Sequence, residues 1–382
     1  MTGIILANAR LALGGTLCDG HLVLRHGLID RVETGPTSAP GAIDCEGDVI
    51  APGLIELHTD NLERHIAPRP GVDWPHHAAV LAHDAELASC GITTVFDALR
   101  VGTLSYPGHD TGYRAYARAL ADEILAMADQ GALKIAHFLH LRAEIPTQTL
   151  LEELDAFGPG DRVRLISLMD HTPGARQFTD LAQFERWVRK AMRLEPAEYE
   201  AYKRFLVDLR DRLGDTNAAG AVAAAARLGA VLASHDDTLP AHVAQSAAQG
   251  VRVAEFPTTR AAAEACRAQG IKVMMGAPNL IRGGSHSGNV AASTLAEMDL
   301  LDIMSSDNVP AALMMAAVRL GRHGDDLPRG LATVTEAPAA AMGLTDRGRL
   351  APGLRADLVR FRVTGEGIPV IRGVWSGGRQ VG

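Results

Sequence analysis

Short apolar runs and longer amphipathic stretches alternate along the central part of the chain. Eight of the apolar runs have the length of a buried parallel strand, and helix-like segments lie between most of them. The runs occupy residues 50–58, 91–99, 134–144, 163–171, 230–236, 251–257, 271–278 and 300–307. Strand–helix alternation repeated eight times predicts a (β/α)8 TIM-like barrel over residues 51–344.

Both ends of the chain show a different pattern. Residues 1–50 and 345–382 alternate apolar and polar positions and are punctuated by Gly, Pro and Asp. Such segments are typical of short strands joined by turns. Two β-rich ends around a long middle therefore predict one small β-sandwich module assembled from both termini.

One connection in the predicted barrel, residues 175–230, is long enough to predict a helical insertion. Its apolar positions recur at helical spacing, at Phe184, Trp187, Val188 and Met192. Two interpretations fit this pattern: an extra helical hairpin packed on the barrel, or a lid over the substrate.

Composition narrows the function. The chain has 382 residues, 47% of them hydrophobic and 21% charged, which suits a folded barrel with a small accessory module. Its net charge of −8 and the lack of a basic run argue against nucleic-acid binding. The four cysteines form no CxxC pair, which argues against a disulfide framework or a thiolate zinc site.

No signal peptide and no stretch of 18 apolar residues is found, so we expect a cytoplasmic protein without a membrane span. A homodimer is the default assembly.

Metal-ligand side chains stand where the apolar runs end. They are His58, Asp60, Glu144, His171, His235 and Asp307. Because the carboxyl ends of all strands in a parallel barrel open on one face, we expect these side chains to converge there. Imidazoles with carboxylates suit one or two divalent ions, zinc foremost, with manganese, iron or nickel as alternatives. Two ions would activate a water molecule and bind the departing oxygen.

Each of these residues also has a purely structural interpretation. His58 fits a satisfied core histidine, Asp60 and Asp307 fit helix N-caps, and Glu144 fits a solvated loop before Pro146. A purely structural explanation of the whole pattern would require all of these unrelated roles to be true at once. A single metal site explains all six positions together, so the pattern favours it. The remaining polar-stretch histidines are predicted to lie on the surface: His76, His77, His83 and His242.

Two loops are candidates for substrate contact. Residues 277–289, after the seventh run, combine glycines with hydrogen-bond donors and suit phosphate binding through backbone N–H groups and a cation. Residues 66–75 form a Pro-rich loop that carries an arginine. The candidate substrate-binding residues are Arg69, Arg282, Gly284, His286 and Asn289. Surface loops without a ligand remain the alternative for both.

Several of these segments carry a family resemblance. They include PGLIELHTDN, HLHLRAEIP, SLMDHTPGARQF, MGAPNLIRGGSHSGN and LLDIMSSD. Through them the chain resembles the amidohydrolase superfamily and, within it, the diphosphatases of the carbon–phosphorus lyase pathway. The chain departs from the superfamily's usual HxH in having His58-Thr59-Asp60, a feature that this subfamily shares. Many relatives in that superfamily use a carbamylated lysine as the bridging ligand; no lysine stands at a suitable strand end here, so Glu144 is the candidate for that position.

The resemblance implies an activity and roles for residues. It implies a metal-dependent hydrolase that cleaves a phosphoanhydride of α-D-ribose 1-methylphosphonate 5-triphosphate, a phosphorylated small molecule, and releases pyrophosphate. The six strand-end residues are then metal ligands, and Asp307 and His235 the catalytic pair. Two alternatives stay open: a C–N hydrolase on the same fold, such as a cyclic amidase or deacetylase, and a non-catalytic scaffold subunit of a phosphonate-processing assembly.

Overall fold

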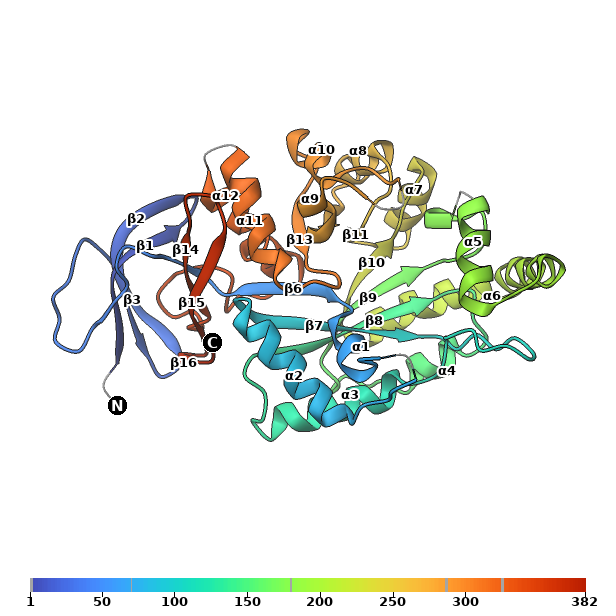
Figure 1. Ribbon diagram of the computed structural model, residues 1–382, viewed down its shortest axis with the longest axis horizontal. Helices are drawn as coiled ribbons and strands as arrows, with labels where there is room; N and C mark the ends of the chain where they lie inside the picture. The colour runs from blue at the N-terminus through green and yellow to red at the C-terminus, as the bar shows by residue number, and fades with distance from the viewer. Residues whose placement is uncertain (1–2, 70, 179–180, 286–287, 324–325) are drawn as a thin grey trace. The chain divides into compact units, whose positions relative to one another are not determined.

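The protein is described here from a computed structural model that covers residues 3–69, 71–178, 181–285, 288–323 and 326–382. Two sheets organise the chain (Figure 1). The Cα positions divide it into two compact units. Unit one comprises Met1–Asp97, Ile124–Phe138 and Met275–Gly382, and unit two comprises Ala98–Glu123 and Leu139–Met274. The domain boundaries expected from the sequence stay a prediction.

The first sheet is built from both termini, as the sequence predicts. Its order is β16-β15-β14-β5-β1-β2-β3, and β4 pairs with β1. Most neighbours are antiparallel, but β1 runs parallel to β4 and β5. The strands are β1 (Ile4–Leu13), β2 (Thr16–Arg25), β3 (Leu28–Thr34), β4 (Ile43–Asp44), β5 (Val49–Pro52), β14 (Leu358–Val363), β15 (Pro369–Ser376) and β16 (Arg379–Gln380).

The second sheet is the predicted barrel, with eight strands in chain order. Its last strand lies beside its first, where Thr59 and Asp307 form a parallel bridge. Each predicted run contributes one strand to this sheet, and the first also contributes to the terminal sheet; the predicted fold class is confirmed. The strands are β6 (Leu54–Thr59), β7 (Ile92–Val101), β8 (Ala136–Glu144), β9 (Val163–Met169), β10 (Val231–His235), β11 (Val253–Glu255), β12 (Lys272–Gly276) and β13 (Ile303–Ser305).

The first predicted run is shared between the two sheets. Val49–Pro52 is β5 of the terminal sheet, and the barrel strand begins only at Leu54. Gly53 lies between the two strands. A Cβ atom at this position would lie 2.1 Å from the Thr93 side chain, too close for any residue other than glycine. The close approach of Thr93 therefore requires glycine where the chain passes from one sheet to the other.

Helices follow most barrel strands and complete the predicted alternation. They are α1 (Asn61–Ile66), α2 (His76–Ser89), α3 (Ala117–Asp129), α4 (Leu150–Asp155), α5 (Leu181–Met192), α6 (Pro196–Leu228), α7 (Pro240–Ala248), α8 (Arg260–Ala268), α9 (Ala277–Arg282), α10 (Ala292–Glu297), α11 (Ala312–His323), α12 (Leu327–Ala332) and α13 (Glu336–Ala341). In the described part of the chain, none combines the length and apolarity needed to cross a lipid bilayer.

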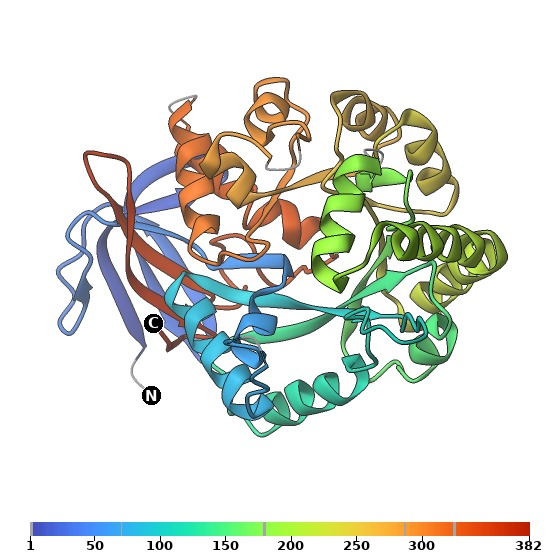
Figure 2. The ribbon, with the colours of Figure 1, turned by 45° about the vertical axis from the view of Figure 1, so that its right-hand side comes forward.

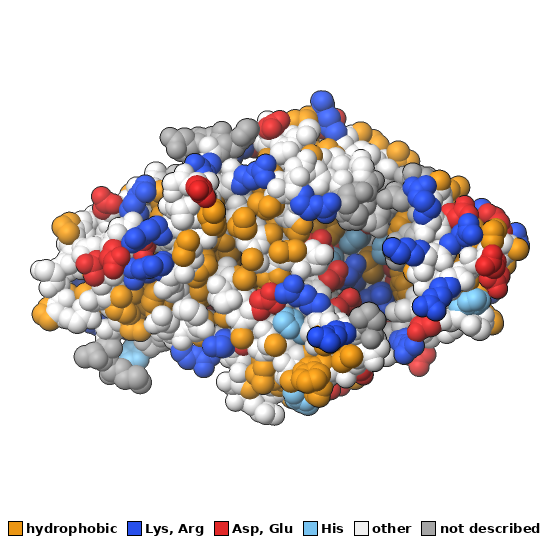
Figure 3. Space-filling model, viewed as in Figure 1, with side chains coloured by type: hydrophobic (Ala, Val, Ile, Leu, Met, Phe, Trp, Pro, Cys, Tyr) orange, Lys and Arg blue, Asp and Glu red, His pale blue; other side chains and the backbone are white. Residues whose placement is uncertain are grey.

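The long insertion forms a helical hairpin within unit two. A 3-10 turn (Arg176–Phe178) leads to α5, which lies beside α6 in Figure 1 and in Figure 2. Helix α6 begins with a capping box at Glu195 and Glu198 and ends at Gly229, whose φ of 66° suits a C-cap. Basic and acidic side chains are interspersed over α5 and α6 on the face drawn in Figure 3. Exposed charge of mixed sign is typical of a solvated helix surface.

Candidate metal centre

Three predicted ligands lie together in unit one and form the first cluster: His58, Asp60 and Asp307. His58 is at the carboxyl end of β6, Asp60 follows that strand, and Asp307 follows β13. Their candidate ligand atoms lie within 4.8 Å of one another. The His58 ring is buried, whereas the two aspartates are partly exposed. Such a set of one imidazole and two carboxylates fits a divalent cation.

A buried carboxylate below the first cluster fixes its strands. Glu56 Oε1 accepts hydrogen bonds from the backbone N–H of His58 at 2.7 Å and from Ser305 Oγ at 2.7 Å. Its other oxygen accepts one from the backbone N–H of Ser306 at 2.5 Å. Glu56 thus joins β6 to β13 and sets the positions from which His58 and Asp307 project.

The strand ends also carry unusual backbone conformations. Asp307, Asp236 and Phe256 have φ of 53°, 57° and 57°. The left-handed region is uncommon for any residue with a side chain, and a genuine outlier for a bulky one such as phenylalanine. Such strain gathers at functional sites, where surrounding contacts hold it.

Four further residues form the second cluster, in unit two: Glu144, His171, His235 and Asp236. The candidate ligand atoms of His171, His235 and Asp236 lie within 4.8 Å of one another. Glu144 Oε2 accepts a hydrogen bond from His171 Nδ1 at 2.6 Å, and Oε1 accepts one from the backbone N–H of His171 at 3.1 Å. Burial alone would lower the pKa of His171, but the charge of Glu144 outweighs it and raises this pKa. The negative charge of Glu144, which raises this pKa, would also attract a metal cation.

The two aspartates after His235 play different parts. Asp236 Oδ2 accepts a hydrogen bond from His235 Nδ1 at 2.8 Å and so orients the ring. Asp237 instead pairs with the buried guanidinium of Arg176. Arg176 Nη1 also donates to the backbone carbonyl of His235 at 3.0 Å. Arg176, from the 3-10 turn before α5, therefore holds the end of β10 in place.

Glu255 is a candidate ligand that the sequence reasoning missed. It is fully buried at the end of β11, and its carboxylate lies within 4.8 Å of the His235 ring nitrogen. His140 Nε2, which lies 3.5 Å from Glu255 Oε1, also hydrogen-bonds Ser167 Oγ at 2.8 Å. The sixth apolar run, residues 251–257, does carry this acidic residue near its end, so a signal was present in the sequence.

The predicted substrate-binding residues that the structure describes belong to unit one. Arg69 lies exposed in the loop after α1, Arg282 is exposed at the end of α9, and Asn289 is half-buried. His286 lies outside the described residues. The predicted loop at 277–289 begins as a helix, because Pro278 suits the first turn of α9 and Gly283, with φ of 81°, suits its C-cap. After α9 the chain continues through Gly284, whose φ of 155° is a backbone conformation that favours glycine.

The prediction that all four of the polar-stretch histidines lie on the surface is wrong. His77 is exposed, and His76 and His242 are half-buried. His83, however, is fully buried on α2, where its Nε2 donates to Asp97 Oδ1 at 2.9 Å and its Nδ1 accepts from Asn61 Nδ2 at 3.0 Å. A polar residue on a polar-looking helix is buried here because β7 supplies a carboxylate partner.

The barrel fold is shared with several solved structures of hydrolases. Solved structures with the same fold include an N-isopropylammelide isopropylaminohydrolase from Burkholderia multivorans, at 18% identity and a TM-score of 0.63, covering 100% of this chain and 98% of that one. An N-acetylglucosamine-6-phosphate deacetylase from Pasteurella multocida is 13% identical with a TM-score of 0.59, covering 99% of each chain. A structure named an amidohydrolase, 18% identical with a TM-score of 0.58, shares the fold as well and covers 99% of this chain.

No protein-family model matches the chain. A curated relative does: the alpha-D-ribose 1-methylphosphonate 5-triphosphate diphosphatase of Escherichia coli (strain K12) is 41% identical over 382 residues, which cover 99% of this chain and 100% of the relative. The chain belongs to the family of this diphosphatase. The resemblance inferred from the motifs is thereby confirmed, and the protein is a hydrolase.

Proposed function

We propose that the protein hydrolyses α-D-ribose 1-methylphosphonate 5-triphosphate to pyrophosphate and the corresponding 5-phosphate. The observation that carries the proposal is the full-length identity of 41% to a diphosphatase of this name. The fold alone would also suit a C–N hydrolase, because several structural neighbours are named as such enzymes. The full-length relative is what favours the phosphoanhydride over the amide, and catalysis over a scaffold role.

Six strand-end residues would hold one or two divalent ions, with zinc the first choice: His58, Asp60, Glu144, His171, His235 and Asp307. The first cluster supports this assignment directly, since His58, Asp60 and Asp307 lie within 4.8 Å of one another. In the second cluster His171 and His235 lie within that distance of each other and of Asp236, and Glu144 is placed beside them by its 2.6 Å hydrogen bond with His171. A bound divalent ion supplies a nucleophilic water near neutral pH and stabilises negative charge on phosphate oxygens. A cytoplasmic location and a homodimer stay predictions.

Protein side chains would carry the proton and the charges of the reaction. The water oxygen forms a bond to a phosphorus of the triphosphate chain while the bond to the pyrophosphate oxygen breaks, and Asp307 accepts the proton of the water. Asp236 keeps the His235 ring in one orientation during this step. Arg69, Arg282, His286, Asn289 and the backbone N–H of Gly284 would bind the phosphate oxygens.

The direct test is phosphorus NMR of the zinc- or manganese-loaded protein with the ribosyl triphosphate, and with ATP in parallel. Pyrophosphate released from the first and hardly from the second supports both the reaction and its specificity. No pyrophosphate from either, with metal bound, contradicts the proposal and directs the search to amide substrates.

The role of Asp307 has its own test. Asp307→Asn is expected to lower kcat by about 10²- to 10⁴-fold, the usual contribution of a general base. Asp299→Asn, an exposed aspartate paired with Arg329, is the matched control and should leave kcat unchanged. Near-full turnover by Asp307→Asn with metal still bound would show that the base is another group.

A further inference from the structure

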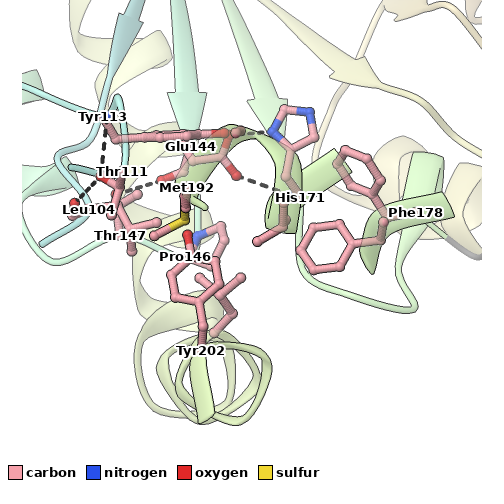
Figure 4. A pocket seen from close by; sticks show the side chains of 14 residues that line it. Leu104, Thr111, Tyr113, Glu144, Pro146, Thr147, His171, Phe178, Met192 and Tyr202 are labelled. Carbon is pink, nitrogen blue, oxygen red and sulfur yellow. Dashed lines mark hydrogen bonds and ion pairs between the residues drawn. The ribbon is translucent and has the colours of Figure 1, made fainter. Parts of the chain in front are cut away.

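A pocket opens beside the second cluster, within unit two (Figure 4). Glu144 and His171 form one side of it, and side chains of the helical hairpin form another. Most of its wall is apolar or aromatic, contributed by residues such as Tyr113, Phe178, Phe184, Val188, Met192 and Tyr202. Among the described residues that line the pocket there is no lysine or arginine.

Aromatic packing fixes the walls of this pocket. The Tyr106 ring packs edge-on against Tyr202, with centroids 4.9 Å apart, and Phe178 packs in the same way on Phe184 at 4.9 Å. Phe178 in turn lies 5.6 Å from the His171 ring. The helices that carry these rings share one buried cluster, so the wall is a preformed surface.

A buried asparagine ties the hairpin to the strand that carries Glu144. Asn217 of α6 donates from its Nδ2 to the carbonyl of Ile145 at 2.8 Å and to that of Thr147 at 2.9 Å. Thr147 Oγ1 donates to the carbonyl of Glu144 at 2.7 Å. The position of α6 is thereby coupled to the position of a predicted metal ligand.

Hydroxyl groups supply the polarity of the pocket. Thr111 Oγ1 donates to the carbonyl of Leu104 at 2.6 Å and accepts from the backbone N–H of Tyr113 at 3.2 Å, which leaves one lone pair as a further acceptor. Within the described chain, the phenol hydroxyls of Tyr113 and Tyr202 have no hydrogen-bond partner. Burial, and next the charge of Glu144, raise the pKa of both tyrosines, so both stay neutral donors.

We propose that this pocket binds the pentose ring of the substrate, an inference that rests on the proposed function. A sugar ring is uncharged, has apolar C–H faces that pack on aromatic rings, and carries hydroxyls that need both donors and acceptors. No lysine or arginine lines the described wall, so we place the phosphate groups at the proposed metal ligands at the edge of the pocket and the uncharged ring against the apolar wall. The hairpin is therefore a specificity element: it separates ribosyl triphosphates from inorganic polyphosphate.

Calorimetric titration of the metal-loaded protein tests this assignment with two simple probes, ribose 5-phosphate and pyrophosphate. Tyr202→Phe and Tyr113→Phe each remove one hydroxyl and keep the ring. Each is expected to weaken ribose 5-phosphate binding by about 3- to 10-fold, the effect of one lost hydrogen bond, and to leave pyrophosphate binding within about 2-fold. Tyr199→Phe, one turn earlier on α6 and outside the pocket lining, is the matched control and should change neither affinity.

Three results would overturn the proposal: ribose 5-phosphate that fails to bind the wild-type protein, equal affinity in wild type and both tyrosine variants, or an equal loss for both probes. The outcome is separable from that of the proposed function, because pyrophosphate release is measured on the wild-type protein alone. A protein that releases pyrophosphate but shows no effect of the tyrosines would keep its function and lose this pocket.

Discussion

A buried imidazolium in unit one makes stability depend on pH above neutrality. His137, at the start of β8, is fully enclosed between two aspartates. Its Nδ1 lies 2.7 Å from Asp97 Oδ2 and its Nε2 lies 3.2 Å from Asp84 Oδ1. Because both nitrogens face carboxylate oxygens, both must donate, and the ring carries a positive charge.

The magnitude follows from the pKa of this ring. Burial alone would lower the pKa of His137, but the charge of Asp97 and the hydrogen bonds to Asp84 and Asp97 raise it from 6.5 to about 9. Because the folded pKa is raised, the stabilisation is fully present below about pH 6.5 and is lost as the pH rises through about 9. A difference of about 2.5 pH units corresponds to about 3 kcal/mol of unfolding free energy.

The assay is urea unfolding at a series of pH values, for the wild-type protein and for His137→Gln. The variant is expected to be less stable at every pH, since Asp84 and Asp97 lose their cation. Its free energy of unfolding should also fall by about 3 kcal/mol less than that of the wild type between about pH 6.5 and about pH 9.5. His77→Gln, an exposed position on α2, is the control and should keep the wild-type slope. Equal slopes for wild type and His137→Gln would refute the buried imidazolium.

Two further predictions concern Glu144 and the asparagine that secures its strand. Glu144→Gln replaces a charged proposed ligand by an amide. The metal content measured by elemental analysis should fall clearly, and the activity should fall by at least about 100-fold. Glu152→Gln, at an exposed position on α4, should change neither, and full metal content in the Glu144 variant would contradict the ligand assignment. Asn217→Ala removes two buried hydrogen bonds; the carbonyl of Ile145 keeps the backbone N–H of Thr147, whereas the carbonyl of Thr147 loses its asparagine donor. The free energy of unfolding in urea titrations should fall by about 1–3 kcal/mol, against less than about 0.5 kcal/mol for the exposed Asp215→Ala. Similar values for the two variants would show that the carbonyl of Thr147 finds another partner.

Local pattern was sufficient for the barrel strands because each is a short apolar run with turn residues around it. The chemistry of the ends of these runs was readable for the same reason: in a parallel barrel, position along a strand specifies which face a side chain reaches. Glu255 was readable in the same way, since it stands near the end of the sixth run and is the last residue of β11. Gly53 shows a real limit, because only the approach of Thr93 explains why one run is shared between two sheets.

By itself, the sequence determined the class of fold, the two-ended terminal sheet and the family, since these depend on periodicity and on motifs that are continuous in the chain. The tertiary structure alone decided which polar residues are buried and what they contact. His83 and His137 lie in unremarkable segments, and their burial is stable only because Asp97 and Asp84 reach them from other elements. The pocket beside the helical hairpin is likewise a feature that only the tertiary structure decided. Its walls come from segments far apart in sequence, and packing, which has no period along the chain, sets its shape.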